Sequence, residues 1–126
     1  RLSAQFPDSA DFLKQLAIYE LRSGLNSKDA AEAKKHYLEA DTLFGQYLSK
    51  NAADSAAWYN HGLALLSLKN FAKAAKVLEK TTEKFTGYAD AWEGLSGAYA
   101  QLGNKGEEAK KAFERSKKLR GESGGK

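Results

Sequence analysis

Residues 57–65 read AWYNHGLAL, and residues 91–99 read AWEGLSGAY. The tryptophans of these two stretches, Trp58 and Trp92, lie 34 residues apart. A third copy lies at the start of the chain, where five residues match the last copy at an offset of 79: Phe6, Ala10, Asp11, Leu16 and Gly24 fall on Phe85, Ala89, Asp90, Leu95 and Gly103. A constant period is typical of a repeat architecture, so we interpret the 126 residues as about three related units.

Each unit is predicted to contain two helices. In the second unit, apolar residues recur at steps of three and four from Trp58 to Leu68, and Lys69 and Asn70 interrupt the pattern. A matching stripe follows from Ala74 to Phe85. Gly62 and Ala74 have no bulky side chain, so we expect the two helix axes to approach most closely there.

Composition excludes several classes of function. The chain has no cysteine, which excludes a thiol nucleophile, a disulfide framework and a cysteine-based zinc site. It has no long apolar run, so no membrane span is expected. The formal charge of +4 is concentrated in residues 105–126, which hold 8 basic and 4 acidic groups. This distribution argues against a nucleic-acid surface that spans the molecule.

The residues of this pattern resemble the tetratricopeptide repeat (TPR) family. The resemblance rests on two sets of residues: Trp58, Gly62, Ala74 and Leu78, then Trp92, Leu95, Tyr99, Ala109 and Phe113. It implies an all-α fold, a right-handed superhelical array of about six helices in antiparallel pairs. We expect one repeat domain over residues 1–120, with repeats at about 10–54, 55–88 and 89–120, and a flexible tail over 121–126.

The first unit carries an insertion at about residues 25–35. We expect Gly24 to end its first helix, and the partner of Ala74 in this unit is Ala40. Asp29 and Glu32 have the spacing of a capping box, which predicts a helix over residues 29–50. Its first turns are expected to project beyond the repeats, either as a lengthened structural helix or as a surface for a partner.

The titratable residues do not form a recognisable catalytic or metal motif. His36 lies near Glu32 and Glu39, but a metal site would need a further ligand, so a surface histidine is favoured. His61 lies on the stripe that packs helix on helix, which favours a hydrogen-bonded histidine in the core or at its boundary. We therefore expect no enzyme activity, no cofactor and no bound metal.

Basic residues surround a thin apolar line in residues 105–120. A terminal helix in a repeat array needs a polar outer face, so we interpret these residues mainly as a solubilising cap. Contact with phosphate or an anionic surface remains the alternative.

In the resembled family the first helix of each pair lines a concave surface. Carrying over these inward positions predicts a peptide-binding groove of nine residues: Lys14, Ile18, Tyr59, Asn60, Leu63, Glu93, Gly94, Gly97 and Gln101. The resemblance thus implies a non-catalytic scaffold that binds a peptide or helix of another protein. Self-association, or docking onto the rest of a longer chain, is the first alternative; nucleic-acid contact through the basic C-terminal helix is the second.

Some family members hold the acidic C-terminal tails of heat-shock chaperones in a clamp of Lys, Asn and Arg residues. Lys14 and Asn60 match this clamp, whereas Ile18 replaces an Asn, Asp90 a Lys, and Gly94 a basic residue. We expect no binding of such tails, because Asp90 and Glu93 would repel a carboxylate. The sequence does not determine the cellular compartment: we expect a soluble protein, either cytoplasmic or exported.

Overall fold

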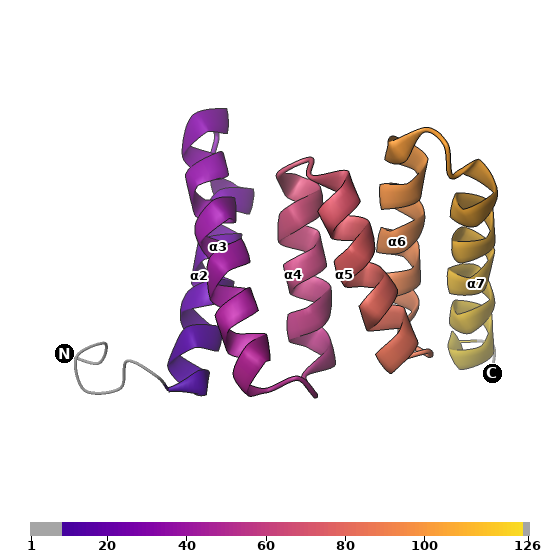
Figure 1. Ribbon diagram of the computed structural model, residues 1–126, viewed down its shortest axis with the longest axis horizontal. Coiled ribbons are helices and arrows are strands. Elements are labelled where there is room, and N and C mark those ends of the chain that lie inside the picture. The colour runs from indigo at the N-terminus through magenta and orange to yellow at the C-terminus, as the bar shows by residue number, and fades with distance from the viewer. Residues whose placement is uncertain (1–8, 125–126) are drawn as a thin grey trace.

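The computed structural model describes residues 9–124, which form six helices and no strand. They are α2 (Ala10–Asn26), α3 (Ala30–Lys50), α4 (Ser55–Ser67), α5 (Phe71–Lys84), α6 (Ala89–Leu102) and α7 (Gly106–Gly124). They stand side by side in three hairpins, with α2 and α7 at opposite ends of the long axis (Figure 1). This arrangement confirms the predicted all-α array of antiparallel helix pairs. Phe6 and Pro7 lie outside the described residues.

Four of the helices have a short polar residue at the N-cap. Ser9, Asp29, Asp54 and Asn70 each accept a hydrogen bond from a backbone N–H of the first turn. These bonds satisfy donors that have no partner inside the helix. The local sequence therefore sets where α2, α3, α4 and α5 begin.

One hydrogen bond recurs with the period of the sequence. The indole Nε1–H of Trp58 donates to the Ala52 carbonyl at 2.8 Å, and that of Trp92 donates to the Thr86 carbonyl at 2.8 Å. Each bond ties the first helix of a unit to the loop that precedes it. Their donors and acceptors are each 34 residues apart, so the same tertiary contact repeats with the period of the sequence.

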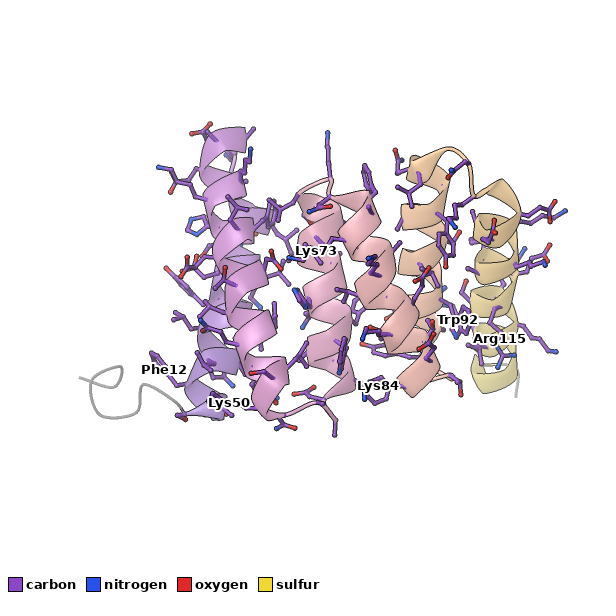
Figure 2. All side chains as sticks on the ribbon, viewed as in Figure 1. Phe12, Lys50, Lys73, Lys84, Trp92 and Arg115 are labelled. Atoms are coloured by element: carbon purple, nitrogen blue, oxygen red, sulfur yellow. The ribbon has the colours of Figure 1, made fainter. Side chains whose placement is uncertain are left out.

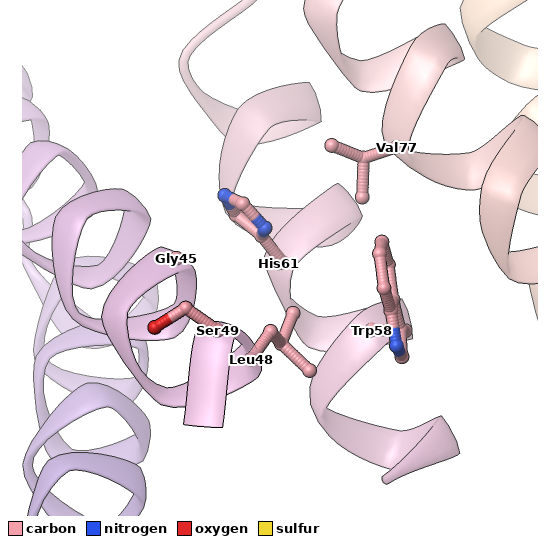
Figure 3. Close-up of a pocket in the computed structure, with 6 residues that line it drawn as sticks. All are labelled: Gly45, Leu48, Ser49, Trp58, His61 and Val77. Carbon is pink, nitrogen blue, oxygen red and sulfur yellow. The ribbon is translucent and has the colours of Figure 1, made fainter. Parts of the chain in front are cut away.

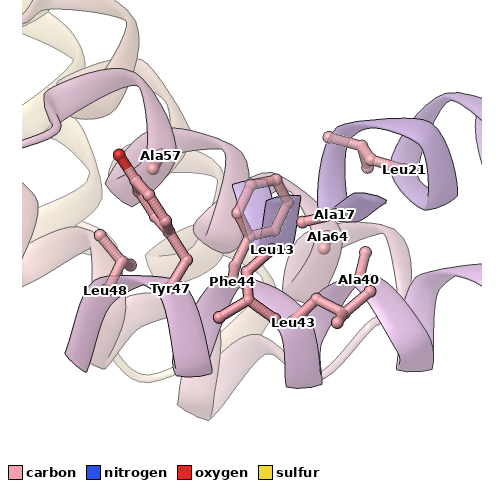
Figure 4. Packing of buried hydrophobic residues seen from close by; sticks show 10 residues of the cluster. All are labelled: Leu13, Ala17, Leu21, Ala40, Leu43, Phe44, Tyr47, Leu48, Ala57 and Ala64. Carbon is pink, nitrogen blue, oxygen red and sulfur yellow. The ribbon is translucent and has the colours of Figure 1, made fainter. Parts of the chain in front are cut away.

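The buried side chains form two clusters. The first joins α2, α3 and α4 and includes Phe44, whose side chain is fully buried (Figure 4). The second joins α4, α5, α6 and α7 around Leu65 and Leu78, which are also fully buried. Burial of one such side chain contributes about 1.5–3 kcal/mol, so most of the stability is expected to come from these two clusters. Because α4 contributes to both, it links the first unit to the other two.

The predicted close approach at Gly62 is confirmed. A Cβ atom built on Gly62 would lie 2.5 Å from Cδ2 of Leu78, too close for any real contact. Ala74 is fully buried on α5, as expected for a small residue at a helix crossing. The absence of a side chain at Gly62 therefore makes room for Leu78 between α4 and α5.

The first unit differs from the prediction at Gly24. The helix α2 does not end there but continues to Asn26, and Gly24 is buried within it. A Cβ at Gly24 would lie 2.5 Å from the Tyr37 ring, so this glycine serves helix packing rather than helix termination. The inserted residues lengthen both helices, and the α2–α3 hairpin rises above its neighbours (Figure 1).

The predicted helix over residues 29–50 is confirmed as α3, but its capping box is only half formed. Asp29 accepts from the Ala31 N–H at 3.3 Å. Its own N–H donates to the Ser27 hydroxyl, while Glu32 lies 3.6 Å from His36. Ser27 thus takes the role that the spacing predicted for Glu32.

In the last helix, α7, lysines occupy positions whose counterparts in α5 are buried. Counting from the matched pair Ala74 and Ala109, the buried residues Ala75, Leu78 and Thr82 correspond to Lys110, Phe113 and Lys117. Phe113 is 45% exposed, and the Lys117 ammonium lies 5.2 Å from its ring centroid. This polar face supports the interpretation as a cap. The helix continues to Gly124, past residue 121 where the flexible tail was expected.

Substitution of two helical glycines should have opposite effects on stability. In Gly62→Ala the new methyl group would overlap Leu78, so we expect the free energy of unfolding to fall by about 1–3 kcal/mol. In Gly97→Ala the methyl group meets nothing within 4 Å. Alanine is the better helix former, so the free energy should rise by up to about 1 kcal/mol. Urea unfolding followed by circular dichroism tests both; an undiminished stability of Gly62→Ala would contradict the close approach.

The cap can be tested by making it apolar. In the Lys110→Leu/Lys117→Leu double variant, the exposed Phe113 gains two apolar neighbours, so we expect concentration-dependent association. Light scattering should show an average mass of at least a dimer at high concentration. The Lys110→Glu/Lys117→Glu variant keeps a polar face and should match the unmodified chain. If the leucine variant also matched it, the lysines would not act as a cap.

Candidate functional site

The nine predicted groove residues lie on three helices, of which the middle one contacts the other two. Lys14 and Ile18 belong to α2, Tyr59, Asn60 and Leu63 to α4, and the other four to α6. The helix α4 contacts α2 on one side and α6 on the other. The structure therefore brings the three first helices of the hairpins into one row, as the resemblance implies.

Lys14 is part of a network that joins three helices. Its ammonium lies 3.1 Å from Asp54, which also accepts hydrogen bonds from the Tyr47 hydroxyl at 2.6 Å and the Ala57 N–H at 3.1 Å. Burial alone would raise the pKa of Asp54, but these hydrogen bonds and Lys14 lower it below its ordinary value. Burial and the bond to Asp54 raise the pKa of Tyr47 to about 12. Lys14 thus has an internal partner and is not a free cation.

The middle of the row is aromatic and apolar. The Tyr59 ring lies 5.5 Å from the Tyr88 ring, centroid to centroid, and burial, with Asp90 and Glu93 nearby, raises the pKa of Tyr59. Ile18 and Leu63 are partly buried against the first core cluster.

Among the predicted groove residues on α4, Asn60 carries an amide. It is half-buried and has no hydrogen-bond partner among the residues that the structure describes. Of the predicted groove residues on α4, the Asn60 amide and the Tyr59 hydroxyl therefore both have unused hydrogen-bonding capacity among the described residues.

The far end of the row holds an ion-pair cluster that sequence reasoning missed. The Arg120 guanidinium of α7 donates to Asp90 and lies 2.8 Å from Glu93. These two carboxylates were expected to repel an acidic ligand; Arg120 supplies one positive charge against their two negative charges. The antiparallel packing of α6 and α7 brings the end of α7 beside the start of α6. Asp90 and Arg120 are 30 residues apart in the sequence, so helical periodicity does not predict their contact.

The two glycines of the predicted groove have different surroundings. A Cβ at Gly94 would lie 3.3 Å from Leu78 and 3.7 Å from Leu66, so Gly94 faces the packed interior. A Cβ at Gly97 would meet nothing within 4 Å, and Gly97 is exposed, as is Gln101 one turn later. Gly97 is therefore the position where bare helix backbone is open to a ligand.

The expected environment of His61 is confirmed. His61 is 8% exposed, and its Nε2 lies 2.7 Å from Asp41 of α3. Asp41 also accepts from Lys73 of α5 at 3.3 Å. Burial lowers the pKa of His61 below its ordinary value, although the bond to Asp41 opposes this shift. The three side chains link three helices, which is a structural role.

His36 joins α2 to α3 rather than standing alone on the surface. Its Nδ1 lies 2.7 Å from Glu20, a contact that the sequence did not reveal. Among residues 9–124, no group of three or more His, Cys, Asp or Glu side chains is arranged to hold a metal ion. Over the same range, no helix is long and apolar enough to cross a membrane.

The comparisons with known proteins agree with this fold. A family model described as tetratricopeptide repeat matches residues 29–88 and, in a second overlapping match, residues 59–123. The comparison with curated protein sequences gives no match.

Two solved structures are similar in fold. The structure named MamA MSR-1 C2 has a TM-score of 0.80 at 19% identity; the match covers 96% of this chain and 63% of that one. The crystal structure of MamA has a TM-score of 0.66 at 19% identity, covering 99% and 86%. At this identity the likeness shows the fold alone.

The pKa shift of His61 predicts how stability depends on pH. Because the folded-state pKa lies below the ordinary value of 6.5, the unfolded chain binds a proton at higher pH than the folded chain does. The free energy of unfolding should therefore fall as the pH drops through 6.5, and fall less in His61→Gln. Urea unfolding at pH 7.5 and 5.5 measures the difference, and NMR titration reads the pKa directly. A His61 pKa at or above 6.5 would contradict the assignment.

Proposed function

Because the chain belongs to the tetratricopeptide repeat family, whose arrays serve as protein-interaction scaffolds, we propose that it binds a segment of a partner protein along α2, α4 and α6. The binding surface consists of the nine predicted residues, with Asn60 and Gly97 at its centre. The occupant is an extended peptide or a helix. The role is that of a non-catalytic scaffold.

The observation that carries this proposal is the unused hydrogen-bonding capacity of Asn60 on α4 together with open backbone at Gly97 on the neighbouring helix α6. An amide side chain donates and accepts, so it can bind the backbone of any extended segment. Exposed backbone at Gly97 allows that segment to approach α6 closely. Ile18 and Leu63 add apolar area to the same row of helices.

The charges of this surface favour a partner segment of low charge. Lys14 is paired with Asp54, and Asp90 and Glu93 are paired with Arg120. A strongly charged ligand would have to break one of these pairs. We therefore expect no binding of the acidic tails of heat-shock chaperones, since the one matching cation, Lys14, already has a carboxylate partner.

Capture of a partner with matched variants tests the proposal. In Gly97→Leu the new side chain covers the open backbone without displacing a neighbour. We expect this variant to bind the captured and then purified partner about tenfold more weakly than the unmodified chain. The control Lys76→Ala changes an exposed residue of α5 and should bind normally. Circular dichroism verifies that both variants keep their helices.

Three other outcomes would contradict the proposal. If Gly97→Leu bound the partner as tightly as the unmodified chain does, the binding site would lie elsewhere on the molecule. Capture of the chain itself alone would favour self-association. Capture that a nuclease or moderate salt abolishes would favour nucleic acid at the basic residues of α7.

A further inference from the structure

A second hollow lies on the other side of α4. It has a volume of about 270 Å³, and α3, α4 and α5 contribute its lining: Gly45, Leu48, Ser49, Trp58, His61 and Val77. Figure 3 shows Leu48, Trp58 and Val77 around an opening that faces Gly45 and Ser49. The lining shares no residue with the proposed groove. Its volume is below the range of about 300–1,000 Å³ that is usual for drug-sized ligands, so it suits a single side chain.

Packing does not explain the glycine at position 45, as it does not explain Gly97. Gly45 lies inside α3, where glycine is a poor helix former, and it is exposed. A Cβ built on it would meet nothing within 4 Å, unlike those of Gly24 and Gly62. Glycine here keeps the mouth of the hollow open and lets another backbone approach α3 closely.

A hollow in the third unit lies between α6 and α7 only. Its lining includes Trp92, Tyr99 and Arg115; Figure 2 labels Trp92 and Arg115. Counting from the pair Ala40 and Ala74, Gly45 corresponds to Glu79, and Glu79 accepts a hydrogen bond from the Tyr99 hydroxyl. The counterpart of Gly45 on α5 thus carries a side chain that is hydrogen-bonded within the array, whereas Gly45 has no side chain.

The charges beside the open hollow are mainly positive. The exposed charged residues of α5 are four lysines and one glutamate: Lys73, Lys76, Lys80, Lys84 and Glu83. The Lys84 ammonium lies 5.8 Å from the centroid of the Trp58 ring. Asp41, the carboxylate on the facing helix, is bonded to both His61 and Lys73. An incoming carboxylate would therefore be attracted to this rim.

We infer that the hollow at Gly45 and Trp58 binds one large apolar side chain of an acidic segment in a partner protein. The apolar side chain packs against Leu48, Trp58 and Val77, and the acidic residues on either side lie near Lys80 and Lys84. This surface is separate from the row of α2, α4 and α6, so the array has two interaction faces.

NMR titration with a designed probe tests the inference. The probe is a capped heptapeptide with a central phenylalanine and three aspartates or glutamates on each side. We expect a saturable shift of the Trp58 indole signal, with the Trp92 indole as internal reference. Two control peptides, with alanine for the phenylalanine or lysine for the acidic residues, should bind at least about tenfold more weakly. Equal binding of either control, or no Trp58 shift at millimolar peptide, would overturn the inference.

Variants of the chain separate the two faces. In Gly45→Leu the Cβ meets nothing within 4 Å and the rest of the side chain covers the mouth, so this variant should abolish the shift without lowering the melting temperature. Lys84→Glu reverses a charge at the rim and should weaken binding as well. Gly97→Leu, on the proposed groove, should bind the probe normally. If Gly97→Leu abolished binding and Gly45→Leu did not, the probe would occupy the groove; the second site would be refuted, and the groove's expected preference for segments of low charge would be wrong.

Discussion

Leu78 is the side chain on which the stacking of the second and third units depends. It is fully buried on α5, with Gly62 of α4 on one side and Gly94 of α6 on the other. Two positions without side chains therefore receive one leucine, and three helices meet around it. Because Leu78 fits between them, α4 and α6 also touch each other directly. A larger residue at Gly62 would push α4 away from α5 and disturb the row of first helices.

Polar side chains reinforce this row at the junctions between hairpins. Asp54 connects α2, α3 and α4 through Lys14, Tyr47 and its own capping bond to Ala57. Asp41 connects α3, α4 and α5 through His61 and Lys73. Each buried or half-buried charge in these networks has a partner, which limits its desolvation cost. Groups that are satisfied in this way hold the helices together.

The two faces of the array differ in the groups that remain available to a partner. On the face of the first helices, these groups include the Asn60 amide and the backbone at Gly97, which can recognise a peptide backbone without regard to charge. On the opposite face, Gly45 leaves an apolar hollow beside the lysines of α5. Under the two proposals, the first surface binds by length and shape, and the second binds one anchoring side chain with acidic neighbours. The array would then contact two partner segments at once.

The sequence by itself determined the features that depend on local spacing. The 34-residue period, the helix over residues 29–50, the close approach at Gly62 and the buried position of His61 all follow from which residues share a helix face. Only the tertiary structure decided which distant groups meet. Lys14 pairs with Asp54, Arg120 pairs with Asp90 and Glu93, and Gly94 lies against Leu78. These contacts depend on how neighbouring helices are rotated and aligned, and packing across the whole array sets that geometry. Helical periodicity specifies only which side of its own helix a residue occupies.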